Sequence, residues 1–266
     1  RATNKCGESA WSAARTVVIL VPLAAPALTA PADATSTCDT TPMFDWSDVS
    51  GATAYRIQAD NNSDFGSPEV NQRPGVSTYT PATALAAGTY YWRVQSTNQC
   101  GDGSWSSPVR SVTLVVPPGA LILTLPENGG EICDLTPTFD WANVTYASGY
   151  RLLVDDDPAF NSPAIDATPA ESTYTPETDL AGGAYYWQAR ATNMCGDGPW
   201  SALWSTTLLT PLPAPALQLP LADGTVCVET PEFDWSSVPR AVGYRIQVDS
   251  SSSFDSPAVD TLTTAS

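Results

Sequence analysis

The chain has 266 residues, and its 28 acidic and 11 basic side chains give it a formal net charge of −17 at pH 7. It contains no histidine, which excludes Ser-His and Cys-His catalytic pairs and histidine-ligated zinc. An acidic chain also lacks the electrostatic attraction to phosphate on which nucleic-acid binding depends. Hydrophobic residues make up 42% of the chain, so the composition is that of a folded protein and not of a disordered polyanion. No apolar run approaches the roughly 20 residues that a membrane-spanning helix needs.

The sequence repeats itself with a period of about 94 or 95 residues. The motif Phe-Asp-Trp of residues 44–46 recurs at 139–141 and 233–235, and Tyr-Tyr-Trp of residues 90–92 recurs at 185–187. The cysteines follow the same spacing in two series, one formed by Cys38, Cys133 and Cys227 and the other by Cys6, Cys100 and Cys195. One period has the size of one β-sandwich domain.

This period divides the chain into four parts. Residues 1–22 match the end of a preceding repeat (the end of strand F, and strand G), 23–117 and 118–212 are full repeats, and 213–266 match the N-terminal half of a further repeat. Prolines mark the junctions, at Pro22, at Pro117-Pro118, and at Pro211 and Pro213. Because short proline-containing linkers are stiff, we expect a rod whose repeats contact only their neighbours. We expect the incomplete outer parts to be completed by neighbouring repeats or by other copies of the chain.

Apolar and polar residues alternate within each repeat, which predicts β-strands. In residues 54–60, Tyr55, Ile57 and Ala59 share one face, and in residues 89–97 the side chains of Tyr90, Trp92 and Val94 do so. Turn-forming residues separate these segments. The predicted core of the repeats includes Trp46, Trp92, Trp141, Trp187, Trp235, Tyr90 and Tyr185.

The segment Leu85-x-x-Gly88-x-Tyr90-x-Trp92-Arg-Val, followed by Gly-Ser-Trp-Ser at residues 103–106, resembles the fibronectin type III repeats of bacterial or archaeal extracellular surface and fibre proteins. Residues 180–187 and 198–201 repeat the pattern. The resemblance implies an all-β fold of tandem immunoglobulin-like sandwiches stacked head to tail. It implies that Tyr90 and Tyr185 are tyrosine corners that bond to backbone near Leu85 and Leu180. In the first full repeat it places strands A, B, C, C′, E, F and G near residues 27–30, 42–46, 54–60, 69–71, 78–80, 89–97 and 109–115.

Six regularly spaced cysteines in a repetitive chain indicate disulfides and export from the cell. In that strand order, Cys38 precedes strand B and Cys100 follows strand F, at opposite ends of one domain. The eight residues between Cys38 and Trp46 alone cover roughly 26 Å as a strand, and a disulfide needs Cα atoms within about 7 Å.

In a head-to-tail stack, the A–B corner of one repeat meets the F–G loop of the next, so we predict a bond between Cys38 and Cys195. Cys133 would pair with the F–G cysteine of a following repeat, the counterpart of Cys6. Cys100 would reach back to a preceding repeat and Cys227 forward. Intradomain pairs, free thiols and other pairings are the alternatives.

Three surface features allow either a structural or a functional interpretation. Arg56 and Arg93 point outward from one sheet and could stack on Trp105, which is predicted to open strand G as Trp200 does in the next repeat. Such a stack stiffens the sheet or forms a carbohydrate platform. The three acids of residues 155–157 are interpreted as a solvated turn, with calcium as the alternative. Asn61 and Asn143 begin N-glycosylation sequons at predicted turns.

These observations predict a structural subunit of an extracellular filament or cell-surface rod, without catalytic residues, metal or cofactor. Its partners would be copies of itself or adjacent repeats in head-to-tail contact, with glycans as a further attachment and no nucleic acid or membrane span. The alternative is an adhesin stalk, or a carbohydrate-binding or spacer module of a larger secreted protein.

Overall fold

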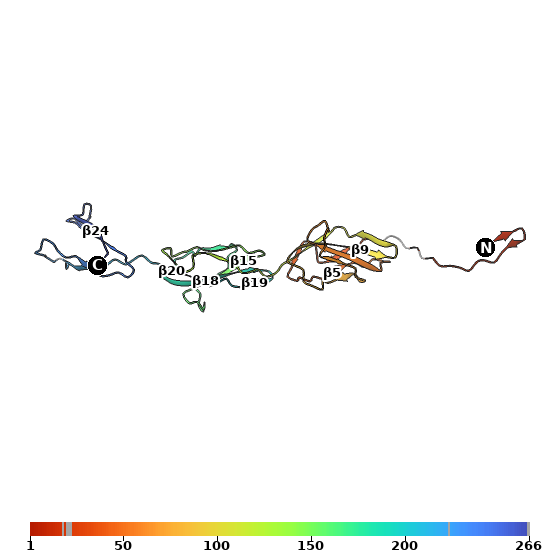
Figure 1. The fold of residues 1–266 in the computed structure, drawn as a ribbon, viewed down its shortest axis with the longest axis horizontal. Helices are drawn as coiled ribbons and strands as arrows, with labels where there is room; N and C mark the ends of the chain where they lie inside the picture. The colour runs from red at the N-terminus through yellow and green to blue at the C-terminus, as the bar shows by residue number, and fades with distance from the viewer. Residues whose placement is uncertain (18, 20–22, 223, 265–266) are drawn as a thin grey trace.

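The computed structural model describes residues 1–17, 19, 23–222 and 224–264, and every regular element among them is a β-strand. The two full repeats follow one another along the long axis of the molecule, with the last group of strands beyond the second repeat (Figure 1). A short hairpin of β1 (Thr3–Asn4) and β2 (Gly7–Glu8) lies at the N-terminal end. The predicted all-β class of tandem sandwiches is confirmed. Pro22, a predicted linker residue, lies outside the described residues.

The first full repeat is a sandwich of two sheets. One has the order β3-β5-β8 and the other β4-β11-β9-β6-β7, with β10 added to the end of β9. The strands are β3 (Leu28–Ala30), β4 (Thr35–Thr37), β5 (Phe44–Trp46), β6 (Ala54–Asp60), β7 (Val70–Gln72), β8 (Thr78–Tyr79), β9 (Gly88–Asn98), β10 (Gly101–Trp105) and β11 (Arg110–Leu114). Tyr55 of β6 lies opposite Ser96 of β9, and Ile57 lies opposite Val94. This register brings the apolar residues of both strands to the same face.

The second full repeat has the same topology, with sheets β12-β14-β17 and β13-β20-β18-β15-β16 and with β19 paired to β18. Its strands are β12 (Leu123–Leu125), β13 (Gly130–Ile132), β14 (Phe139–Trp141), β15 (Gly149–Asp155), β16 (Ile165–Ala167), β17 (Thr173–Tyr174), β18 (Gly183–Asn193), β19 (Gly196–Asp197) and β20 (Trp204–Leu208). Residues beyond it form the pairs β21 (Leu217–Leu219) with β22 (Asp234–Trp235) and β23 (Tyr244–Val248) with β24 (Val259–Thr263). The boundaries drawn between repeats stay predictions.

A parallel strand pair in each full repeat has no counterpart in the strands predicted from the sequence. β4 pairs parallel with β11, and β13 pairs parallel with β20. The N–H of Val115 continues the first pair by donating to the carbonyl of Thr37 over 2.9 Å. This pairing holds Cys38, the next residue, beside the point where the chain leaves the first repeat.

Each full repeat has its own core of aromatic rings. Trp92 is completely buried and meets Phe44 edge to face, with ring centroids 5.1 Å apart, and Trp187 meets Phe139 at the same distance. The other predicted tryptophans, Trp46, Trp141 and Trp235, are at most 9% exposed. Rings of this size bury enough apolar area to dominate the stability of a domain of about 95 residues.

The two predicted corner tyrosines are buried beside the loops that lead into their strands, between β8 and β9 in the first repeat and between β17 and β18 in the second (the E–F loops). Tyr90 is 4% exposed and hydrogen-bonds with the backbone of Ala86, one residue beyond Leu85. Tyr185 is 8% exposed and hydrogen-bonds with the backbone of Ala181, one residue beyond Leu180. Burial raises the pKa of both hydroxyls, and the negative charge of Glu69 near Tyr90 and of Asp156 near Tyr185 raises it further.

Truncating the central ring of the second repeat should destabilise that repeat strongly. Trp187→Ala is expected to lower its free energy of unfolding by about 3–5 kcal/mol, because it leaves a large cavity beneath Phe139. Urea unfolding of the full chain measures the loss. Ile122→Ala is the control, since Ile122 is 71% exposed and its truncation should cost less than about 0.5 kcal/mol. Equal losses for the two variants would contradict this account of the core.

Alkaline pH should weaken the fold through the corner tyrosines. Because the pKa of each hydroxyl is raised in the folded chain, the folded chain keeps these protons to higher pH than the unfolded chain does. The stability contributed is present below the ordinary tyrosine pKa of about 10 and is lost as pH rises beyond it. A double variant, Tyr90→Phe with Tyr185→Phe, should be less stable at neutral pH and lose less stability between about pH 9 and pH 11. An unchanged pH slope in this variant would be the contrary result.

Candidate functional site: the junction between repeats

A disulfide joins the two full repeats across their junction. Cys38 directly follows β4 at one end of the first repeat, and Cys195 lies in the turn between β18 and β19 of the second. The two Cα atoms are 5.4 Å apart although 157 positions separate them in the sequence. This is the predicted bond, and it excludes the alternative pair of Cys38 with Cys100.

Asn193 ties the cysteine turn to the linker between the repeats. Its Oδ1 accepts the N–H of Cys195 over 2.8 Å. Its Nδ2 donates to the carbonyl of Val116 in the linker over 2.8 Å and to the carbonyl of Tyr146 over 3.0 Å. One amide side chain therefore joins the disulfide, the linker and the B–C loop of the second repeat. Asn4 and Asn98 make the same turn, accepting from the N–H of Cys6 and Cys100 over 2.7 and 2.8 Å.

A glycine in the F–G hairpin of each full repeat lets the linker pass close to it. A Cβ on Gly198 would lie only 2.6 Å from the carbonyl oxygen of Pro118, which no side chain tolerates. A Cβ on Gly103, its counterpart in the first repeat, would lie 3.0 Å from the Cβ and the carbonyl oxygen of Leu23. Each linker is therefore held against the hairpin of the repeat that it enters.

The other four cysteines, Cys6, Cys100, Cys133 and Cys227, are exposed and carry free thiols. Cys6 and Cys100 lie in F–G hairpins like Cys195, and Cys133 directly follows β13 as Cys38 follows β4. Their pairing with cysteines of further repeats stays a prediction.

The outer face of the first repeat carries the expected arginine stack. The guanidinium of Arg93 lies 4.3 Å from the ring centroid of Trp105 and 3.9 Å from that of Phe65. It donates to Oε1 of Gln58 from two nitrogens, over 3.0 and 2.8 Å. Arg56 lies 5.8 Å from the same tryptophan ring. Phe65, which no pattern in the sequence marked as part of the stack, reaches it from a loop where its backbone has a positive φ of 58°.

The second repeat keeps a cation over tryptophan by a different residue. Gln188 stands where the first repeat has Arg93, and Arg190, two positions further along the strand and on the same face, lies 4.5 Å from the ring centroid of Trp200. It also forms an ion pair with Asp197. The sequence predicted that Trp105 and Trp200 each open strand G, and neither does. Trp105 ends β10, and Trp200 lies between β19 and β20.

The acidic C–C′ turn is solvated only in part, because Asp156 is exposed, as the sequence interpretation expected, but Asp155 is not. Asp155 is 3% exposed, and its carboxylate accepts the N–H groups of Asp157 and Ser162. Asp60 and Asp249 accept N–H groups two and seven residues further on in the same way. The recurring aspartate therefore organises the loop. Within the described ranges, no group of three or more His, Cys, Asp or Glu side chains could hold a metal ion.

Both sequons lie on the surface. Asn61 follows β6 in the C–C′ loop and is exposed, and Asn143 is exposed in the B–C loop. The Oδ1 of Asn143 accepts the hydroxyl of Tyr150 over 3.1 Å, which leaves its Nδ2 free of that contact. Glycosylation of either residue stays a prediction.

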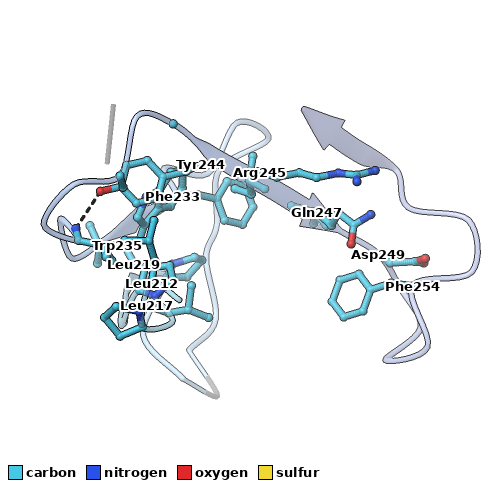
Figure 2. Close-up of a pocket in the computed structure, with 18 residues that line it drawn as sticks. Leu212, Leu217, Leu219, Phe233, Trp235, Tyr244, Arg245, Gln247, Asp249 and Phe254 are labelled. Atoms are coloured by element: carbon cyan, nitrogen blue, oxygen red, sulfur yellow. Dashed lines mark hydrogen bonds between the residues drawn. The ribbon is translucent and has the colours of Figure 1, made fainter. Parts of the chain in front are cut away.

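An apolar groove of about 560 Å³ opens among the strands beyond the second repeat (Figure 2). Phe233, Trp235 and Tyr244 line it, together with Leu217 and Leu219. Phe233 is the counterpart of Phe139, which in the second repeat packs against Trp187. The groove therefore corresponds to the core of a full repeat and is not a separate ligand pocket.

Comparison with known proteins does not assign the chain to a family. No family model matches it. No protein of curated function matches it either. Among solved structures it is similar to the crystal structure of chicken CNTN1 FN1-FN3 domains, with 16% identity over 70% of this chain and 67% of that chain and a TM-score of 0.37. The fold assignment rests on the strand pairings described above. A search of the described residues for helices that could cross a membrane finds none.

The close approach at Gly198 makes the junction sensitive to a single methyl group. Gly198→Ala should lower the free energy of unfolding of the second repeat by about 1–3 kcal/mol, because the linker carbonyl must move. It should also slow formation of the Cys38–Cys195 bond during oxidative refolding. Gly119→Ala is the matched control in the same linker, since a Cβ there meets no atom within 4 Å. Loss of stability in Gly119→Ala and none in Gly198→Ala would contradict the packing described.

Proposed function

We propose that this protein is a structural subunit of an extracellular filament or cell-surface rod built from fibronectin type III-like repeats. The observation that carries the proposal is the covalent bond between consecutive repeats, made by Cys38 at an A–B corner and Cys195 in an F–G hairpin. A bond at this position adds a covalent constraint to the placement of the two domains, beyond the contacts of the stiff linker.

The disulfide also supports a location outside the cell, because such bonds persist in oxidising compartments. The net charge of −17 fits a long surface exposed to water, since it disfavours sideways association of strand edges. Head-to-tail partners would be further repeats or other copies of this chain. They would use the exposed F–G cysteines Cys6 and Cys100 and the exposed A–B cysteines Cys133 and Cys227.

The alternative role as a carbohydrate-binding module receives less support from the aromatic face. A sugar would stack on an open ring face of Trp105, but the Arg93 guanidinium already lies over that ring and is bonded to Gln58. In the second repeat, Arg190 lies over Trp200 in the same way. These stacks are complete within each repeat and stiffen the sheet.

Disulfide mapping tests the proposed assembly. The full chain would be concentrated under mild oxidation, imaged by negative-stain electron microscopy, and digested without reduction. We expect unbranched filaments in which every bond between copies joins an F–G cysteine to an A–B cysteine, such as Cys100 to Cys227. The double variant Cys133→Ser with Cys227→Ser removes both free A–B cysteines. It should prevent the filaments from growing and leave the Cys38–Cys195 bond intact. Bonds mostly between cysteines of the same class, or no filaments, would contradict the proposal.

A further inference from the structure

We propose that the Cys38–Cys195 disulfide is a tension bypass, so that force applied to the ends of the chain is carried past nearly all of the core of each full repeat. Pulling on a covalently cross-linked chain loads the shortest covalent route between the ends. In this chain that route runs along the backbone to Cys38, across the sulfur bond and onward from Cys195. Residues 39–194 form a closed loop outside it.

The loaded route follows the long axis of both repeats. It enters the first repeat through β3 and β4, and β4 ends directly before Cys38 at the junction. It leaves the second repeat through β20, beyond Cys195. These strands are already extended, at about 3.3 Å per residue, so the route has little slack to give under load.

Nearly all of the apolar core lies inside the unloaded loop. In the first repeat, Leu28 is the one member of the buried core cluster that precedes Cys38. In the second, Leu208 is the one member that follows Cys195. The linker at residues 115–119, with the Asn193 contact to Val116, is also inside the loop. Without the disulfide, every one of these residues would lie in series with the applied force.

The disulfide keeps a long stretch of chain from being extended under force. An extended chain spans about 3.3–3.6 Å per residue, so the sequence separation of 157 between the cysteines corresponds to about 530 Å of contour that cannot be pulled out while the bond is intact. Reduction by dithiothreitol, which supplies two electrons and becomes a cyclic disulfide itself, yields two thiols and frees this length. The loaded path lies within one chain and is the same whether or not copies assemble into filaments.

Single-molecule stretching of the full chain tests the bypass. Handles would be attached through peptide tags at both ends, and each molecule would be pulled to full extension before and after dithiothreitol. We expect the contour length to increase by about 530 Å on reduction. The oxidised chain should show no unfolding step as long as a whole repeat, which would be about 320 Å.

Two variants separate the bond from other effects of reduction. Cys38→Ser with Cys195→Ser should give the long contour without reductant, and this result does not depend on how stably the variant folds. Cys100→Ser with Cys133→Ser is the matched control and should behave as the parent chain does. An oxidised parent chain with the same contour length as the reduced one would overturn the proposal, as would whole-repeat steps before reduction. A gain of only about 210 Å would indicate a Cys38–Cys100 bond and would overturn it as well.

Discussion

The structure depends on the direction of one short strand. β4 runs parallel to β11, so the A–B corner that follows it arrives where the chain leaves the first repeat. The F–G hairpin of the next repeat lies on the other side of the same linker, and the two cysteines meet there. If the three residues of β4 ran in the other direction, Cys38 would lie about 13 Å further from the junction, beyond the Cα–Cα distance that a disulfide can bridge. The junction contacts of Asn193 and Gly198 follow from this placement.

The junction and the repeats are stabilised by different interactions. Each repeat buries its own rings around Trp92 or Trp187 and so needs no core shared with its neighbour. At the junction, a hydrogen bond such as that from Asn193 to Val116 contributes about 1 kcal/mol. A disulfide contributes about 2–4 kcal/mol and, unlike a hydrogen bond, survives local opening. The covalent bond is therefore the strongest link between the repeats, and a force applied to the chain ends is transmitted through it.

The outer surface shows which features of a repeat can vary. The aspartate that organises the C–C′ loop is Asp60, Asp155 or Asp249, and each accepts the same two backbone N–H groups although the loop residues around it differ. The arginine over tryptophan moves between positions, from Arg93 to Arg190, and keeps its ring contact. A backbone-directed contact needs one fixed position. A contact with a large ring can be made from neighbouring positions on the same face of a strand.

The sequence alone determined the repeat, the all-β class and the buried rings, because apolar alternation is a local signal and the period can be read directly from the recurring motifs. Residues 54–60, for example, form β6 with the predicted bounds. The prediction that Cys38 pairs with Cys195 needed more, namely the strand order implied by the family resemblance and a head-to-tail stack of repeats. Only the tertiary structure decided that Thr35–Thr37 is a strand, that Phe65 completes the arginine stack, and that Asp155 is buried. These features depend on partners that the local sequence does not specify. Thr35 pairs with Val112, which is far along the chain. A short polar segment has no apolar alternation from which a strand could be predicted.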